Sequence, residues 1–228
     1  MSRLATRILA VLVPAALLVP AASHAAVVTV EDGAGDAKAL NWAVVYGGLF
    51  NGTSTDEAQV FLDAPAETSA DVVRTTIDHA RKRLTLTVQF RDLVDVEGHS
   101  VEFRIFTPEG RYYLIAARSG DRTTADFSPG RGSVVVISDG DLEGSGDGTK
   151  PCRTVRARYD LTADTLTASV PNACIGSPKW VQIAAGVSRT KLTPLEDGSV
   201  NLAGYVDDAF RGGVSIQSLG RSPKVRRG

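Results

Sequence analysis

The chain contains few of the residues on which most catalytic sites depend. Its 228 residues include two cysteines and three histidines, and aromatic residues make up 6% of the total. A serine or cysteine nucleophile needs a positioned base, usually histidine, and no Gly-x-Ser-x-Gly sequence occurs. The histidines and cysteines also lack the spacing of zinc ligands. These absences argue against nucleophilic and zinc-dependent hydrolases, and the aromatic content is low for a dedicated lectin.

Long apolar runs are also missing after the first 25 residues, which have the three parts of a secretory signal peptide. Arg3 and Arg7 form a basic region, residues 8–19 are almost wholly apolar, and Ser-His-Ala at 23–25 is a small-x-small cleavage site before Ala26. The apolar core is too short to span a bilayer, which needs about 20 residues. We therefore expect residues 1–25 to be removed and the protein to be secreted into the extracellular space, with no membrane span.

Neither sign of charge dominates the remaining 203 residues. Arg3 and Arg7 leave with the signal peptide, so 23 basic and 26 acidic side chains remain, a net charge of −3. This balance gives no overall attraction to nucleic acid or to membranes. The length suits one domain with a buried core, which we place at 26–220. The basic residues of 221–228 predict a disordered tail.

Alternation of apolar and polar residues is the main structural signal. Leu84, Leu86 and Val88 share one face of a predicted strand, and Thr85 and Thr87 share the other. Short turn signals between such segments favour antiparallel hairpins. The sequence therefore predicts an all-β fold, an antiparallel two-sheet β-sandwich of about nine strands. The predicted strands are residues 27–30, 72–77, 84–90, 101–105, 111–117, 134–138, 155–159, 166–170 and 181–187.

Two stretches interrupt this rhythm. Residues 41–65 are long for a connection and combine aromatic residues with glycine and a Ser/Thr run, so they are either irregular or contain an extra strand or a turn of helix. Residues 139–150 form an acidic, glycine-rich loop. Both are candidates for a functional surface.

The two cysteines predict a disulfide bond. In an exported chain a single pair of cysteines is usually oxidised. Cys152 precedes the predicted strand 155–159, and Cys174 follows the predicted strand 166–170. A hairpin through residues 160–164 would bring them together.

Carboxylates give the clearest chemical signal. Calcium needs six to eight oxygen ligands, several of them anionic, on loops that glycine allows to turn tightly. Asp32 and Asp36 straddle two glycines after the first predicted strand, and Asp207 and Asp208 lie near the end of the last. Because chain ends often lie close together in a domain, we expect Asp32 and Asp36 to combine with Asp207 or Asp208 around a structural calcium ion.

The loop at 139–150 is a second candidate for calcium. It has acids at positions 1, 3, 5 and 9 and glycine at position 6 of an EF-hand-like loop. Position 12 is Lys150, where a bidentate glutamate is required. The loop could equally be a solvated hairpin tip that prevents aggregation.

Several short motifs carry a family resemblance over nearly the whole mature chain. In chain order they are Asp32-Gly-Ala-Gly-Asp36, Ile77-Asp78-His79-Ala80, Tyr159-Asp160, Val170-Pro171, Cys174-Ile-Gly-Ser-Pro-Lys-Trp-Val181 and Tyr205-Val-Asp-Asp208. Together they resemble a group of secreted actinobacterial β-sandwich proteins, similar in outline to carbohydrate-binding module family 9 and DOMON-like domains. The resemblance implies a fold and a bound calcium. It carries over no sugar-binding site.

The sequence thus favours a secreted, non-catalytic β-sandwich protein with an extracellular binding or structural role, whose ligand is unknown. The alternative is a carbohydrate-binding module for extracellular polysaccharide, in which Trp42 and Tyr46 stack on sugar rings. A hydrolase with an acid pair is a third hypothesis, although nothing in the sequence brings two acids to the required separation.

Overall fold

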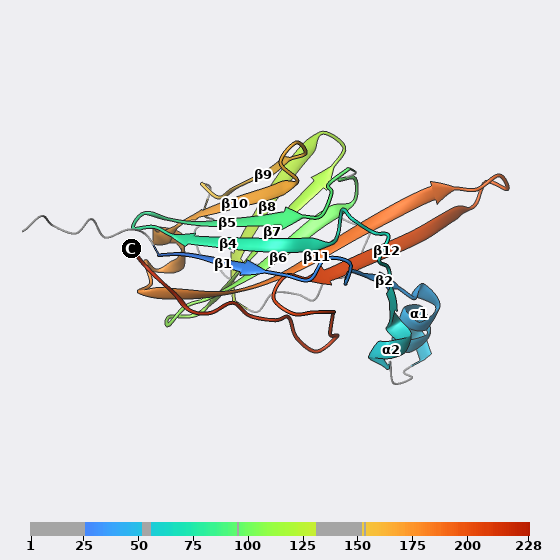
Figure 1. Ribbon diagram of the computed structural model, residues 1–228, viewed down its shortest axis with the longest axis horizontal. Helices are drawn as coiled ribbons and strands as arrows, with labels where there is room; N and C mark the ends of the chain where they lie inside the picture. Colours follow the sequence, from blue (N-terminus) through green and yellow to red (C-terminus); the bar gives the residue numbers. More distant parts are fainter. Residues whose placement is uncertain (1–25, 52–55, 95, 131–151, 153) are drawn as a thin grey trace, which may run out of the picture.

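A computed structural model describes residues 26–51, 56–94, 96–130, 152 and 154–228 (Figure 1). The predicted signal peptide, the predicted strand 134–138 and the acidic loop 139–150 lie outside the described residues. In the described part, no helix has the length and apolar character needed to cross a membrane.

Two antiparallel sheets form the body of the molecule and confirm the predicted all-β sandwich. The first sheet has the order β1 (Ala26–Glu31), β4 (Val72–His79), β5 (Arg83–Phe90), β10 (Thr165–Pro171) and β9 (Arg156–Asp160). The second has the order β3 (Phe61–Asp63), β2 (Lys38–Leu40), β12 (Val200–Asp208), β11 (Trp180–Pro194), β6 (His99–Phe106), β7 (Arg111–Ser119) and β8 (Arg122–Pro129). A short strand, β13 (Val225–Arg226), pairs with the start of β11.

The predicted alternation decides which side chains form the core. Leu84, Leu86, Val88 and Phe90 of β5 are at most 1% exposed, whereas the residues between them are only half-buried on the outer face. Apolar side chains from β4, β6, β10 and β11 meet them between the sheets. Burial of these apolar surfaces is the main favourable contribution to folding.

The described residues contain thirteen strands, more than the pattern predicted. Strands β2 and β3 have three residues each and only partial burial, so their pairing with neighbouring strands defines them and alternation does not. The described parts of the long stretch 41–65 contain two helices and a strand, namely α1 (Trp42–Asn51), α2 (Glu57–Val60) and β3. A short 3₁₀ helix, η1 (Asn172–Ile175), follows β10.

The C-terminal segment is ordered, so the prediction of a disordered tail at 221–228 was wrong. Val225 is 1% exposed and joins the core, while Lys224 and Arg226 on either side are exposed. The ring nitrogen Nδ1 of His79 lies 3.2 Å from the Val225 carbonyl oxygen, and the Gly228 amide donates to the His79 carbonyl at 3.0 Å. The burial of Val225 and the backbone hydrogen bonds of this basic segment hold it against the sheets.

The predicted disulfide is confirmed between Cys152 and Cys174, whose Cα atoms are 5.9 Å apart. It ties the segment before β9 to η1 across a sequence separation of 22 residues. Replacing both cysteines with serine should lower the free energy of unfolding by about 3 kcal/mol, because the unfolded chain regains the entropy of that loop. Urea denaturation measures the loss. A folded protein with two alkylatable thiols, or a midpoint indifferent to reducing agent, would contradict this prediction.

Candidate metal centre

Three aspartates from distant parts of the chain meet at one end of the sandwich. Asp36 lies in the connection between β1 and β2, Asp71 directly precedes β4, and Asp207 lies near the end of β12. Each offers a carboxylate oxygen within 4.8 Å of an oxygen from the other two. Asp71 and Asp207 are at most 1% exposed. The three form a compact, buried acidic group, which we call the aspartate triad.

Backbone amides fix the orientation of these carboxylates. The Gly35 amide donates to Asp71 Oδ2 at 2.8 Å, and the Val72 amide donates to Asp207 Oδ2 at 2.7 Å. Gly35 has a φ of 88°, a left-handed conformation that glycine adopts without strain. The turn after β1 therefore holds the Asp71 carboxylate through the Gly35 amide and also carries Asp36.

Two oxygens of the aspartate triad have no hydrogen-bond partner among the described residues. Asp36 accepts the Gly213 amide at Oδ2, 3.1 Å away, but its Oδ1 is buried and unpartnered. The Oδ1 of the fully buried Asp71 is likewise unpartnered. A buried polar atom without a partner is costly. Both atoms are therefore available to a ligand that prefers anionic oxygen.

Asp32 lies beside the aspartate triad. Its Oδ1 accepts the Gly33 amide at 2.9 Å, and its Oδ2 is a third buried oxygen without a partner in the part of the chain that the structure describes. Burial, together with the charges of Asp36, Asp208 and Asp71, raises the pKa of Asp32 to about 7, although the Gly33 hydrogen bond opposes the shift. Asp32 can therefore add a fourth carboxylate.

Asp208 has a different role because neighbouring residues of a strand point to opposite faces. Asp207 faces the space between the sheets, where Val72 contacts it. Asp208 lies on the other face of β12, where it is fully buried, and its two oxygens accept the amides of Gly220 at 2.6 Å and Phe210 at 3.2 Å. Asp208 therefore anchors the chain that follows β12. Of the four predicted ligands, the structure brings Asp36 and Asp207 into the triad, Asp32 beside it, and Asp208 to the other face of β12.

Asp71 completes the aspartate triad and was not among the predicted ligands. Its sequence signal is weak: it is a single acid directly before the predicted strand 72–77. The antiparallel pairing of β1 with β4 places the end of β1 beside the start of β4. Asp71 therefore meets the turn that carries Asp32 and Asp36, a position that only knowledge of the strand order reveals.

Burial and mutual repulsion favour either protonation of these carboxylates or a positive charge beside them. Burial, together with the neighbouring Asp36 and Asp32 charges, raises the pKa of Asp207 to about 8. Burial also raises the pKa of Asp71, although the guanidinium of Arg91, whose Nε lies 3.0 Å from Asp71 Oδ2, opposes the shift. Near neutral pH Asp32 and Asp207 therefore hold protons in part, and a bound cation would displace them.

Trp42 and Tyr46, the predicted sugar-stacking pair, lie on α1 and not in an open loop. Their ring centroids are 5.6 Å apart, and Tyr46 is 46% exposed. The indole of Trp42 covers Gly204 of β12 so closely that a Cβ there would lie 2.7 Å from its Cζ2 atom. Trp42 therefore helps to attach α1 to the sheet, and Tyr46 presents the more accessible ring.

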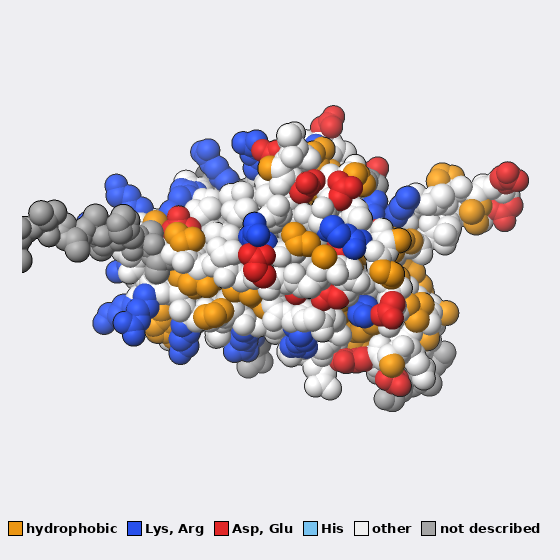
Figure 2. All heavy atoms as spheres, in the orientation of Figure 1, with side chains coloured by type: hydrophobic (Ala, Val, Ile, Leu, Met, Phe, Trp, Pro, Cys, Tyr) orange, Lys and Arg blue, Asp and Glu red, His pale blue; other side chains and the backbone are white. Residues whose placement is uncertain are grey.

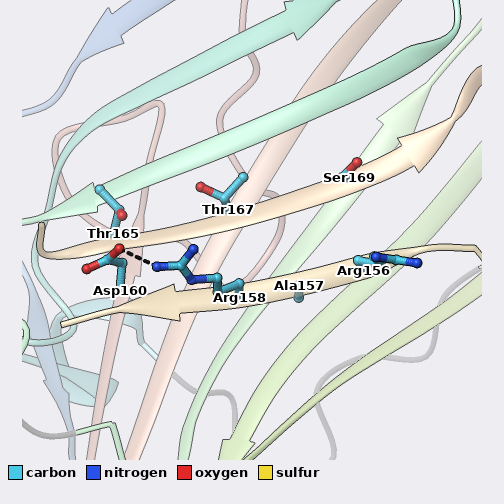
Figure 3. A pocket seen from close by; sticks show the side chains of 7 residues that line it. All are labelled: Arg156, Ala157, Arg158, Asp160, Thr165, Thr167 and Ser169. Atoms are coloured by element: carbon cyan, nitrogen blue, oxygen red, sulfur yellow. Dashed lines mark hydrogen bonds and ion pairs between the residues drawn. The ribbon is translucent and has the colours of Figure 1, made fainter.

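A shallow pocket of about 280 Å³ lies on the outer face of β9 and β10 (Figure 3). Its lining residues are Arg156, Ala157, Arg158, Asp160, Thr165, Thr167 and Ser169. Arg158 is neutralised by Asp160, with 2.7 Å between Nη2 and Oδ2. The pocket thus combines hydroxyl groups with an exposed guanidinium at Arg156. It lies at the opposite edge of the sheet from β1 and is separate from the aspartate triad.

Both described histidines serve structural contacts. His99 is fully buried, with Nδ1 2.9 Å from the Tyr159 hydroxyl and Nε2 2.9 Å from the Ser69 carbonyl oxygen. His79 is held by Val225.

Comparison of the chain with models of protein families, with curated proteins and with solved structures finds no match. The geometry of the described residues therefore carries the functional interpretation.

Proposed function

We propose that this is an extracellular, non-catalytic β-sandwich protein whose fold is tied together by one calcium ion, and which acts by binding or as a structural component. The observation that carries the calcium site is the buried Asp71 carboxylate, which lies beside Asp36 and Asp207 and whose Oδ1 has no partner among the residues that the structure describes. Asp32 would supply a further oxygen.

The donor set favours calcium among the common metal ions. All four side chains offer carboxylate oxygens, the ligands of a hard cation, and none is the histidine or cysteine that zinc prefers. Bound here, the ion would join the β1–β2 connection, the start of β4 and the end of β12. Because these segments are far apart in sequence, such an ion would stabilise the tertiary structure.

Two further features support an extracellular, non-catalytic role. The disulfide bond suits an oxidising compartment, as does the signal peptide that the sequence predicts. His79 and His99 are buried against structural partners, so neither is placed to act as a base on an external substrate.

Isothermal titration calorimetry of the metal-free protein with calcium chloride tests this proposal. We expect one calcium ion to bind per chain and Asp71→Asn to abolish binding. Asp126→Asn, a change at an exposed acid on β8, is the matched control and should bind calcium normally. Absence of calcium binding by the unmodified protein at millimolar concentration would overturn the calcium site.

A carbohydrate-binding module is the second candidate, and two surfaces favour it: the exposed Tyr46 ring and the pocket beside Arg156. Retention on insoluble polysaccharides separates the two surfaces. If α1 binds sugar, Tyr46→Ala should abolish retention with a smaller loss of melting temperature than Trp42→Ala, which also removes the contact with Gly204. If the pocket binds, Arg156→Ala should abolish retention instead. Failure of the unmodified protein to bind any polysaccharide would remove this candidate.

A further inference from the structure

The hairpin of β11 and β12 extends well beyond the sheet that contains it. Strand β6 pairs with β11 as far as Arg189, and β2 pairs with β12 only at Tyr205 and Val206. Residues 191–203, which we call the arm, therefore form a two-stranded ribbon with no other strand beside it among the described residues. Figure 1 shows this hairpin projecting along the long axis, at the end opposite the C-terminus.

One face of the arm is apolar. Leu192 pairs with Leu202, and Pro194 pairs with Val200, so these four side chains share a face. Leu192 is 65% exposed and Val200 is 56% exposed. An isolated two-stranded hairpin is marginally stable in water, and exposed apolar surface commonly marks an interaction site. The arm therefore has the features of a segment that docks on another surface.

The tip of the arm is acidic. Glu196 and Asp197 are both exposed at the turn, next to Leu195, which is 48% exposed. Asp197 also accepts hydrogen bonds from the amide and the hydroxyl of Ser199, at 2.9 and 2.6 Å, which fix the turn. A partner for the tip should combine positive charge with apolar surface.

The opposite end of the molecule has these properties. Three segments supply its exposed cations, and backbone hydrogen bonds from Arg227 to Lys179 and from Gly228 to His79 join these segments. The exposed cations are Arg81, Lys82, Lys179, Lys224, Arg226 and Arg227. We call them the basic end. Lys224 Nζ lies 4.2 Å from the centroid of the Trp180 ring, so an aromatic surface accompanies the charge. In Figure 2 Lys and Arg side chains gather at this end, and acidic side chains mark the tip of the arm.

We propose that the arm of one copy docks on the basic end of a second copy, with the acidic tip among the cations and Leu195 against the Trp180 surface. The two surfaces lie at opposite ends of the long axis, so the contact is head to tail. Such a heterologous contact leaves a free arm and a free basic end on every assembly, and it propagates as an open filament unless the rotation closes a ring. This inference deepens the proposed structural role by naming a second copy of the chain as the partner.

Sedimentation velocity over a roughly hundredfold range of protein concentration tests the contact, since association follows mass action. The unmodified protein should grow in mass with concentration, and high salt should oppose this growth because exposed charges are screened. Leu192→Ser with Val200→Ser should weaken association by about tenfold or more. All samples are compared in calcium and in chelator, so failure of the calcium site is seen separately.

Two charge-reversed variants give the sharper test. The tip variant carries Glu196→Lys and Asp197→Asn, since asparagine can still accept the Ser199 bonds. The end variant carries Lys82→Glu, Lys179→Glu, Lys224→Glu and Arg226→Glu, so that four acids outweigh the two remaining cations, Arg81 and Arg227. Each alone should remain monomeric, because its tip and its end now have the same sign. An equimolar mixture should regain association, because each variant's tip is complementary to the other's end. Asp121→Lys, on the β7–β8 turn, is the control and should associate like the unmodified protein.

Three results would overturn the proposal. The first is an unmodified protein that stays monomeric at every concentration in calcium. The second is association that both charge-reversed variants retain. The third is association that the tip variant loses and the end variant keeps, which would mean that arms pair with each other.

Discussion

Excess calcium should raise the melting temperature of the metal-free protein by roughly 5–10 °C. A ligand present at about 100 times its dissociation constant stabilises the native state by about 2.7 kcal/mol, and each kcal/mol moves the midpoint of a domain this size by about 2–4 °C. The physical reason is the aspartate triad, whose buried carboxylates repel one another until a cation neutralises them. Differential scanning calorimetry in calcium and then in chelator measures the shift.

Variants of the aspartates separate the calcium site from general stability. Asp36→Asn and Asp71→Asn should remove the response to calcium, because each loses a charge and an unpartnered anionic oxygen. Asp126→Asn, at an exposed acid on β8, is the matched control and should leave both the melting temperature and the calcium response unchanged. A calcium response that survives in Asp71→Asn would refute this assignment.

The effect of pH gives an independent check. The raised pKa values of Asp207, about 8, and Asp32, about 7, mean that the native protein without calcium holds protons that the unfolded chain has already released. Between about pH 4 and pH 8 the native state binds more protons, so its stability falls as pH rises. Above about pH 8 both states have released them, and this decline ends. Because calcium displaces these protons, the rise in melting temperature that calcium causes should be larger at pH 8 than at pH 5.

Removing the Glu67 carboxylate should be the most destabilising single change considered, with an expected loss of about 3–5 kcal/mol in the free energy of unfolding. Both Glu67 oxygens contact Arg189 Nη1, at 3.0 and 2.9 Å, and both side chains are 7% exposed. Glu67 Oε1 also accepts the amides of Ser69 and Ala70, each at 3.0 Å. Glu67→Ala would leave a buried guanidinium and two buried amides without this partner.

Urea denaturation of three variants tests this explanation. Glu67→Gln keeps an acceptor for the amides and should be less destabilising than Glu67→Ala. Adding Arg189→Leu to Glu67→Ala removes the guanidinium that has lost this carboxylate and should recover part of the loss. Since the amide bonds hold the segment leading to Asp71, Glu67→Ala should also weaken calcium binding. A loss below about 1 kcal/mol for Glu67→Ala would show that Arg189 finds another partner.

Local chemistry accounts for the features that the sequence predicted correctly. Buried and half-buried side chains alternate along β5 because successive strand side chains point to opposite sides. The apolar Leu84, Leu86 and Val88 show this period in the sequence. The Cys152–Cys174 bond joins the two ends of one hairpin, so neighbouring strands are enough to predict it. The acids after the first strand and near the end of the last were also found, because both groups are short motifs.

The candidate site required the tertiary structure. Alternation gives each residue a face, but it does not say which strands are neighbours. Only the pairing of β1 with β4 brings Asp71 to Asp36, and only the register of β12 against β11 sends Asp207 inward and Asp208 to the other face of β12. The same holds for Val225, a single apolar residue in a basic segment, whose burial depends on the partner strand β11. The sequence by itself determined an all-β sandwich with a disulfide and two acidic motifs. Contacts between distant segments decided which carboxylates meet, because strand order and register depend on the packing of the whole chain.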